Sequence, residues 1–177
     1  WPHIEAGVEA IVVTASGCGV QVRDYGHILA DDTLYAEKAA KISSLSRDPS
    51  EVLAGEKAAL LPLLAARPER RGKLAFHSPC TLQHGLQIRG SIEVLLQSAG
   101  YDLTPVADSY LCCGSAGTYS VLQPELAGML RANKLAALNA GGPALAATAN
   151  IGCLTHLQAG SSLPVRHWIE LIDEVLA

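Results

Sequence analysis

Two adjacent cysteines followed by a glycine, Cys112-Cys113-Gly114, constrain this chain more than any other feature of its sequence. Two further cysteines stand in similar surroundings, in His77-Ser-Pro-Cys80 and in Asn150-Ile-Gly-Cys153. Each lies beside proline or glycine, which interrupt regular structure, so we expect these thiols in loops. Thiols gathered from three separate loops suit a metal ion or an iron–sulfur cluster better than an apolar core.

Other uses of cysteine fit this sequence less well. The cysteines number five, which is odd, and they are widely spaced in a chain that is not a small secreted scaffold. Neighbouring cysteines are also too constrained for ordinary disulfide geometry. A buried cysteine that serves as a small apolar filler is the ordinary alternative for any one of these residues taken alone.

The composition limits the class of protein. The chain has 177 residues, 49% of them hydrophobic and 17% charged, which predicts a folded domain with a substantial core. A formal charge of −4 without a basic stripe argues against nucleic acid as a partner. No apolar run is long enough to span a membrane, and no targeting signal is recognisable, so we expect a cytoplasmic protein with reduced thiols. The chain begins with Trp1 rather than with methionine, and its apolar residues are in surplus over its charged ones. Together these two features predict a fragment of a longer protein or a subunit with buried interfaces.

Hydrophobic periodicity, capping residues and turn residues predict alternating strands and helices. The expected strands are 9–14, 73–77, 101–105 and 144–148, with a further strand end near 165. The expected helices are 20–29, 33–45, 49–64, 87–98, 124–139 and a closing helix up to 175. This alternation predicts an α/β fold whose mostly parallel sheet is flanked by helices.

In such a sheet, ligands collect where the strands end and the loops begin. Cys80 and Cys153 each lie just beyond a predicted strand, and Cys112-Cys113 lies in a loop that leads to the helix starting at Pro124. The fold can therefore bring these four thiols into one crevice. The polar segment Arg67–Gly72 is the best candidate for a boundary between subdomains.

The order of these cysteines resembles the cysteine-rich CCG domain. That domain occurs in heterodisulfide reductase, in lactate-utilisation proteins and in the iron–sulfur subunit of glycolate oxidase. The neighbouring residues are most similar to the glycolate oxidase branch over essentially the whole chain. They are Phe76-His-Ser-Pro-Cys-Thr-Leu-Gln-His84, Leu111-Cys-Cys-Gly-Ser-Ala-Gly-Thr-Tyr119, Asn150-Ile-Gly-Cys-Leu-Thr-His156, Val165-Arg-His-Trp-Ile-Glu-Leu171 and Ala15-Ser-Gly-Cys18-Gly.

The resemblance implies a Rossmann-like architecture with ligand loops at the strand ends. It divides the chain into residues 1–70, the tail of a first CCG repeat with a helical connection, and residues 71–177, a complete second repeat. It also implies an electron-transfer subunit, not catalytic alone, in a complex that oxidises a 2-hydroxy acid such as glycolate. The flavin belongs to a partner subunit, and an N-terminal ferredoxin-like domain is absent from this chain. The complex is expected in the cytoplasm, with peripheral association at the inner face of the membrane left open.

For the cofactor, the resemblance implies an iron–sulfur cluster, [4Fe–4S] or non-cubane, held by Cys80, Cys112, Cys113 and Cys153. The sequence departs from the family motif at one position, where Cys153-Leu-Thr-His156 stands in place of Cys-x-x-Cys. Histidine can ligate iron, and three or four thiolates with one imidazole also suit tetrahedral Zn²⁺. His156 is therefore a candidate ligand, and structural Zn²⁺ stays an alternative to the cluster.

The remaining residues carry weaker signals. His77 and His84 flank Cys80 and are candidates for hydrogen bonds to cluster sulfurs, although ordinary loop contacts are the simpler explanation for each. Cys18 is expected to belong to the site of the first repeat. Direct thiol catalysis, as in a heterodisulfide-reductase-like module, is a third hypothesis, with Cys112 or Cys113 as the nucleophile. Because no dinucleotide fingerprint is present, we expect no flavin or nicotinamide on this chain.

Overall fold

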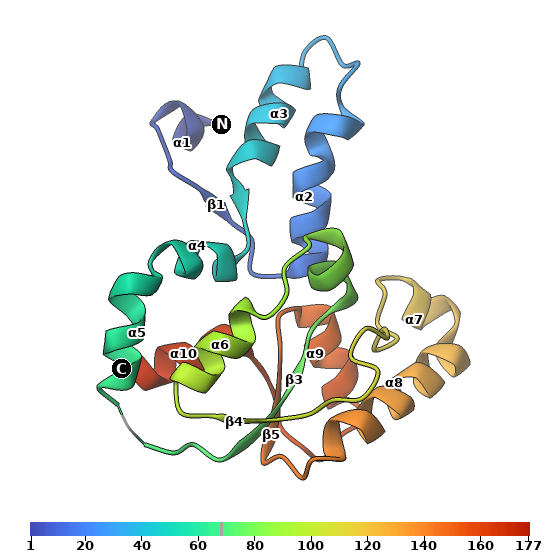
Figure 1. The fold of residues 1–177 in the computed structure, drawn as a ribbon. Coiled ribbons are helices and arrows are strands. Elements are labelled where there is room, and N and C mark those ends of the chain that lie inside the picture. The colour runs from blue at the N-terminus through green and yellow to red at the C-terminus, as the bar shows by residue number, and fades with distance from the viewer. Residues whose placement is uncertain (68) are drawn as a thin grey trace.

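A four-stranded parallel sheet organises the larger part of the molecule in the computed structural model, which describes residues 1–67 and 69–177. Its strands are β3 (Lys73–His77), β4 (Asp102–Thr104), β5 (Leu145–Thr148) and β6 (Val165–His167). They lie in the order β4-β3-β5-β6, and every neighbouring pair is parallel. The predicted α/β class with a mostly parallel sheet is therefore confirmed (Figure 1).

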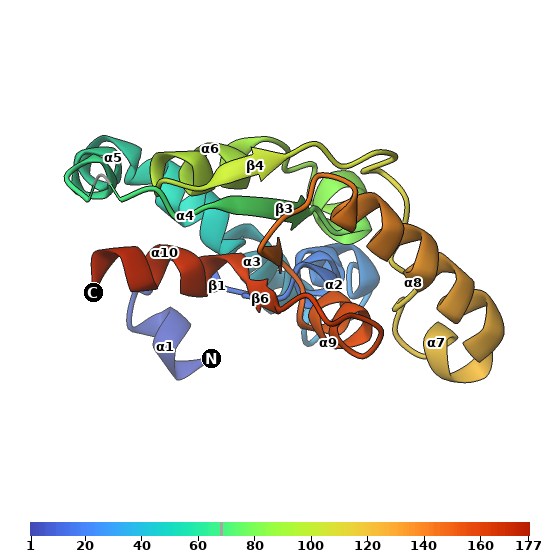
Figure 2. The ribbon, with the colours of Figure 1, turned by 90° about the horizontal axis from the view of Figure 1, so that it is seen from below.

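Helices cover this sheet in two groups. Figures 1 and 2 show α5 (Lys57–Ala65), α6 (Ser91–Ser98) and α10 (Trp168–Leu176) on one side. The other side carries α7 (Tyr119–Leu122), α8 (Pro124–Asn139) and α9 (Ile151–Gln158). Successive strand residues point to opposite faces, so Leu74 and Phe76 join the first core cluster while Ala75 joins the second. The second cluster also contains Cys113 and Cys153, so the thiols lie on the α8–α9 side of the sheet.

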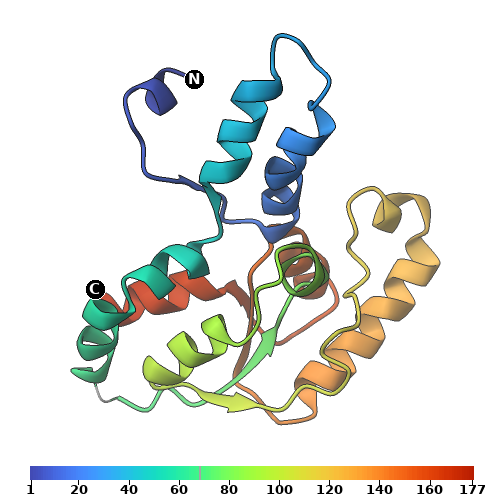
Figure 3. The same cartoon turned by 45° about the horizontal axis from the view of Figure 1, so that its top comes forward.

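The N-terminal part forms a separate layer above the sheet in Figure 3. It consists of α1 (Pro2–Glu5), β1 (Ile11–Val12), α2 (Ser16–Ile28), α3 (Ala36–Leu45) and β2 (Ser46–Arg47), with β1 and β2 paired in parallel. Polar contacts of Thr14 and Ser16, at the start of α2, join this layer to the main body. The Ser16 amide donates to the Ala149 carbonyl (3.2 Å), the Ser16 and Thr81 hydroxyls lie 2.8 Å apart, and His167 Nε2 lies 2.9 Å from the Thr14 carbonyl oxygen.

Several predicted boundaries were wrong, each for a local reason. The strand predicted over 9–14 is paired only at Ile11–Val12, and the helix predicted from residue 20 already begins at Ser16. The helix predicted from residue 33 begins at Ala36, because Asp32 accepts hydrogen bonds from the Leu34 and Tyr35 amides and holds a turn there.

The predicted helix over 49–64 is two helices, α4 (Pro49–Gly55) and α5, which meet at Glu56 beside a glycine. The helix predicted over 87–98 begins only at Ser91, because Gln87 (φ 60°) and Gly90 (φ 78°) are left-handed. The wide π-helical turn η1 (Thr81–Gly85) and the short helix α7 were not predicted. Within the predicted boundary 67–72, Arg67 and residues 69–72 are irregular, and Pro68 lies outside the described residues.

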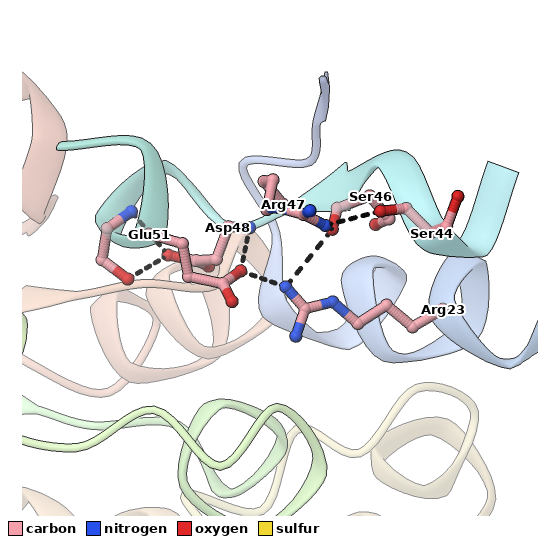
Figure 4. Close-up of polar contacts among 7 residues, drawn as sticks. Arg23, Ser44, Ser46, Arg47, Asp48 and Glu51 are labelled. Carbon is pink, nitrogen blue, oxygen red and sulfur yellow. Dashed lines mark hydrogen bonds and ion pairs between the residues drawn. The ribbon is translucent and has the colours of Figure 1, made fainter. Parts of the chain in front are cut away.

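The predicted helix start at residue 49 is confirmed, and Asp48 is its N-cap. The Asp48 side chain accepts from the Ser50 amide (2.9 Å), and the Asp48 amide donates to Glu51 (2.8 Å), a reciprocal capping box. Glu51 also pairs with Arg23 of α2, which ties the cap to the N-terminal layer (Figure 4).

Replacing Asp48 with alanine should lower the free energy of unfolding by about 1–2 kcal/mol, because the Ser50 amide loses its acceptor inside the protein. Asp48→Asn should cost much less, since asparagine is an equally good cap. Urea unfolding of both variants measures this difference. Equal losses in the two variants would show that the carboxylate charge, rather than the cap, is what matters.

No helix in the described parts of the chain is both long and apolar enough to cross a bilayer.

Candidate metal centre

Three connections that leave neighbouring strands carry the four thiols. Cys80 follows β3 and immediately precedes η1, Cys112 and Cys113 lie between β4 and α7, and Cys153 is in the first turn of α9 after β5. Because β4, β3 and β5 are adjacent and parallel, their carboxyl ends share one edge of the sheet. The structure thus places these cysteines just beyond their strands, as predicted, although Cys153 lies within helix α9 rather than in a loop.

The four thiols form a continuous group. Cys112 contacts both Cys80 and Cys113, and Cys113 in turn contacts Cys153. Cys113 and Cys153 are buried, with 1% and 4% of their surfaces exposed, whereas Cys80 and Cys112 are partly exposed. All are free thiols. Cys18 is exposed, so the structure assigns it no place in this group.

Local structure holds the Cys112-Cys113 loop against helix α8. Gly114 has φ 94°, and a Cβ at this position would lie 2.5 Å from the carbonyl oxygen of Ala127. Only glycine combines this left-handed backbone with so close an approach. The Gly114 amide also donates to Cys112 Sγ at 3.3 Å, which favours a thiolate there. The glycine of the Cys-Cys-Gly motif therefore sets the position of both thiols.

The thiols influence one another's ionisation. Interactions with the Cys113 and Cys80 thiols lower the pKa of Cys112, while the contact with Cys112 raises the pKa of both partners. The Cys113 thiol likewise lowers the pKa of Cys153, and the neighbouring imidazole of His77 acts in the same direction. The group therefore stabilises negative charge on some of its sulfurs, as metal ligation requires, since thiolate is the form that binds metal.

A histidine completes the closest donor group. A ring nitrogen of His77 and the sulfurs of Cys113 and Cys153 lie within 4.8 Å of one another, and all three residues are buried. The sequence marked His77 only as a flanking residue, because nothing local reveals that the end of β3 faces α9. The structure directs His156 elsewhere: its Nε2 lies 3.3 Å from the Ala127 carbonyl oxygen, and it is not part of this donor group. His84 is exposed.

A buried lysine that sequence reasoning missed lies beside the thiols. Lys134 is only 3% exposed, and its Nζ donates to the Asp108 carbonyl oxygen at 2.9 Å. Burial lowers the pKa of Lys134, while the nearby sulfurs of Cys113 and Cys112 oppose this shift. Lys134 and Cys112 line one cavity of about 200 Å³. The signal in the sequence is a lysine on the same face of α8 as the buried Ala127 and Leu138.

These donors fit a metal centre. Thiolates with or without one imidazole are the usual ligands of iron–sulfur clusters and of structural zinc. The donor set contains no carboxylate, which argues against Mg²⁺ or Ca²⁺. What the arrangement offers chemically is a closed, mostly buried set of soft donors at the edge of a sheet.

Comparisons with known proteins agree with this geometry. The chain is 52% identical over 176 residues to the glycolate oxidase iron–sulfur subunit of Escherichia coli, covering 99% of this chain and 42% of that protein. It is 30% identical to a probable glycolate oxidase iron–sulfur subunit of Bacillus subtilis, covering 86% of this chain and 34% of that protein. It is 23% identical to lactate utilization protein A of Shouchella clausii over 95% of this chain and 71% of that protein.

The chain thus spans less than half the length of the two glycolate oxidase subunits that it matches. Residues 74–158 match the family of cysteine-rich domains known as CCG, and this stretch contains all four grouped cysteines. The predicted resemblance is confirmed: residues 74–158 are similar to the cysteine-rich CCG domain, and the sequence is similar throughout to a glycolate oxidase iron–sulfur subunit.

Proposed function

We propose that this chain is part of an electron-transfer subunit in which Cys80, Cys112, Cys113 and Cys153 hold an iron–sulfur cluster. The observation that carries the proposal is the convergence of these four thiols at one edge of the sheet. The similarity to iron–sulfur subunits of glycolate oxidase supports it. When bound, such a cluster takes up and releases single electrons.

The chain's own residues shape the site for this task. Cys113 and Cys153 place their sulfurs in the protein interior, and Gly114 lets the loop approach α8 closely enough to do so. Cys80 and Cys112 stand at the partly exposed side, where a redox partner can approach. Lys134 places a positive charge near sulfurs that carry negative charge when they ligate a metal. Burial and nearby charge are the factors that set a cluster's reduction potential.

The wider assembly follows from the same similarity. We propose that the complex oxidises a 2-hydroxy acid, glycolate in the first instance, on a flavin-containing partner subunit. Electrons then pass through a ferredoxin-like domain that precedes these residues in the complete polypeptide. Residues 1–70 and 71–177 are the end of a first CCG repeat and a complete second one. A cytoplasmic location, at the inner face of the membrane or free of it, keeps the five thiols reduced.

Structural Zn²⁺ is the second candidate for the same site. The buried group of His77, Cys113 and Cys153 has the mixed nitrogen and sulfur donors of closed tetrahedral zinc sites. In that case the site would stabilise the fold, and the electron path would run through other domains.

Metal and sulfide analysis of the complete polypeptide, purified without oxygen, separates the two candidates. We expect about four iron and four sulfide attributable to this site, with visible absorbance and an EPR signal on reduction. One zinc without sulfide at the site would show that the site is structural and holds no cluster. The absence of both iron and zinc from the purified protein would refute the proposal.

A further inference from the structure

His77 occupies a position that points it at the thiols. It is the last residue of β3, pairs with Thr148 of β5, and is 1% exposed. Side chains alternate along a strand, so His77 shares a face with Ala75, on the side of the sheet that packs against Cys113 and Cys153. The strand itself therefore directs the imidazole into the thiol group.

Neither ring nitrogen of His77 has an oxygen or nitrogen partner among the described residues, although both are buried, and the polar group that interacts with the imidazole is the Cys153 thiol. Leaving a buried polar atom unpaired costs about 1–3 kcal/mol. Buried unpaired groups are rare in native proteins, and binding an ion is one way in which such a group is satisfied. An unpaired imidazole within 4.8 Å of two cysteine sulfurs has the chemistry of a metal ligand.

The geometry points to His77 as a direct nitrogen ligand of the metal centre, and this inference rests on the proposed function. A single zinc ion, the second candidate for this site, has bonds of ~2.0–2.1 Å to nitrogen and ~2.3 Å to sulfur and holds neighbouring ligand atoms roughly 3.5–3.8 Å apart, whereas the ligands of a cubane cluster bind separate irons and stand farther apart. Ligand atoms within 4.8 Å of one another reach that spacing by small side-chain movements.

His156 is the competing nitrogen donor, because it stands at the position of the family motif's last cysteine. Its Nε2 already lies 3.3 Å from the Ala127 carbonyl oxygen, and the carbonyl of His156 itself accepts from Arg131 at 3.4 Å. The imidazole of His156 has a carbonyl oxygen as its partner, whereas that of His77 has no oxygen or nitrogen partner among the residues that the structure describes. The nitrogen ligand is therefore His77 at the end of β3 rather than His156 in α9.

The choice of ligand has a consequence for redox chemistry. If His77 takes the place of one of the four thiolates, the centre loses one negative charge, and such a replacement raises the reduction potential of a cluster. For a zinc centre, the same replacement makes the site less negative without altering its tetrahedral shape.

The test compares His77→Ala, His156→Ala and His77→Cys in the complete polypeptide purified without oxygen. The readouts are the rate of metal release to a chelator and a spectroscopic search for nitrogen bound to the metal. Pulsed EPR with ¹⁵N-labelled histidine serves for iron, and the X-ray absorption fine structure of the metal serves for zinc. Clusters held by cysteine alone elsewhere in the polypeptide contribute no imidazole signal.

We expect an imidazole signal in the unaltered protein that persists in His156→Ala and disappears in His77→Ala and His77→Cys. Loss of residues that merely support a ligand costs roughly 10–100-fold in metal affinity, so losing His77 should speed release about 100-fold or more. His77→Cys should retain the metal, because it supplies a thiolate instead, and this retention separates ligand loss from misfolding.

A bound metal without an imidazole signal, or a signal that disappears in His156→Ala and persists in His77→Ala, would overturn the assignment while leaving the cysteine centre intact. No metal in the unaltered protein would overturn both the assignment and the proposed function.

Discussion

Replacing Cys113 with serine should abolish metal binding at this site. Cys113 is the most buried of the four thiols and contacts the thiols on both sides of it, Cys112 and Cys153. A serine hydroxyl does not ionise near neutral pH and is a poor ligand for iron or zinc, so the centre loses its innermost donor. We expect the metal attributable to the site to fall to near zero, by elemental analysis and visible absorbance of the purified protein.

Ala116→Ser is the matched control. It places the same hydroxymethyl side chain on an exposed residue of the same loop. Its metal content should equal that of the unaltered protein. Full metal content in Cys113→Ser would mean that Cys113 is a buried apolar residue rather than a ligand.

Gly114→Ala should both destabilise the protein and weaken the metal centre. The new Cβ would lie 2.5 Å from the Ala127 carbonyl oxygen and 3.0 Å from Leu130 Cβ, so the loop or α8 must move. A left-handed backbone costs a non-glycine residue about 1–2 kcal/mol, and forcing atoms into a packed interior costs about 1–3 kcal/mol more. The loss in unfolding free energy should therefore be roughly 2–5 kcal/mol by urea titration, with a reduced metal content.

The same loop offers a control that separates these two costs. Gly117 is also left-handed, with φ 60°, but a Cβ there would meet no atom within 4 Å. Gly117→Ala should show only the backbone cost of about 1–2 kcal/mol and should keep its metal. If Gly114→Ala and Gly117→Ala lowered the unfolding free energy and the metal content equally, the close approach to α8 would not be the reason why glycine stands at position 114.

The sequence predicted those elements that have strong local signals. The bounds of β3 and α8 agree with expectation, because β3 contains the compact apolar run 74–76 and because Pro124 and Gly141-Gly142 mark the limits of the helix. The meeting of the four cysteines was predictable for a more general reason. Parallel strands present their carboxyl ends at one edge, so residues just beyond these ends come together whatever the connecting helices do.

What the sequence did not reveal depends on neighbours that are distant along the chain. No hydrophobic periodicity in the sequence predicts the break between two helices at Glu56 or the π-helical turn at Thr81–Gly85. His77 and Lys134 gain their importance from residues on other elements, α9 for the first and the Cys112-Cys113 loop for the second. The family motif favoured His156, whereas the geometry places His77 among the thiols, a distinction that only three-dimensional contact can supply.

The distribution of the thiols over three connections has a mechanical consequence. An ion bound by Cys80, Cys113 and Cys153 would join the chain at points that follow β3, β4 and β5, the three neighbouring strands of the sheet. It would act as a cross-link, and each closed loop of this kind removes conformational freedom from the unfolded chain, worth about 3–5 kcal/mol for loops of tens of residues. Oxidative loss of the centre would then loosen one edge of the sheet as well as interrupt the electron path. Because locally unfolded segments are cleaved more readily, a molecule that has lost its cofactor would also be degraded faster by proteases.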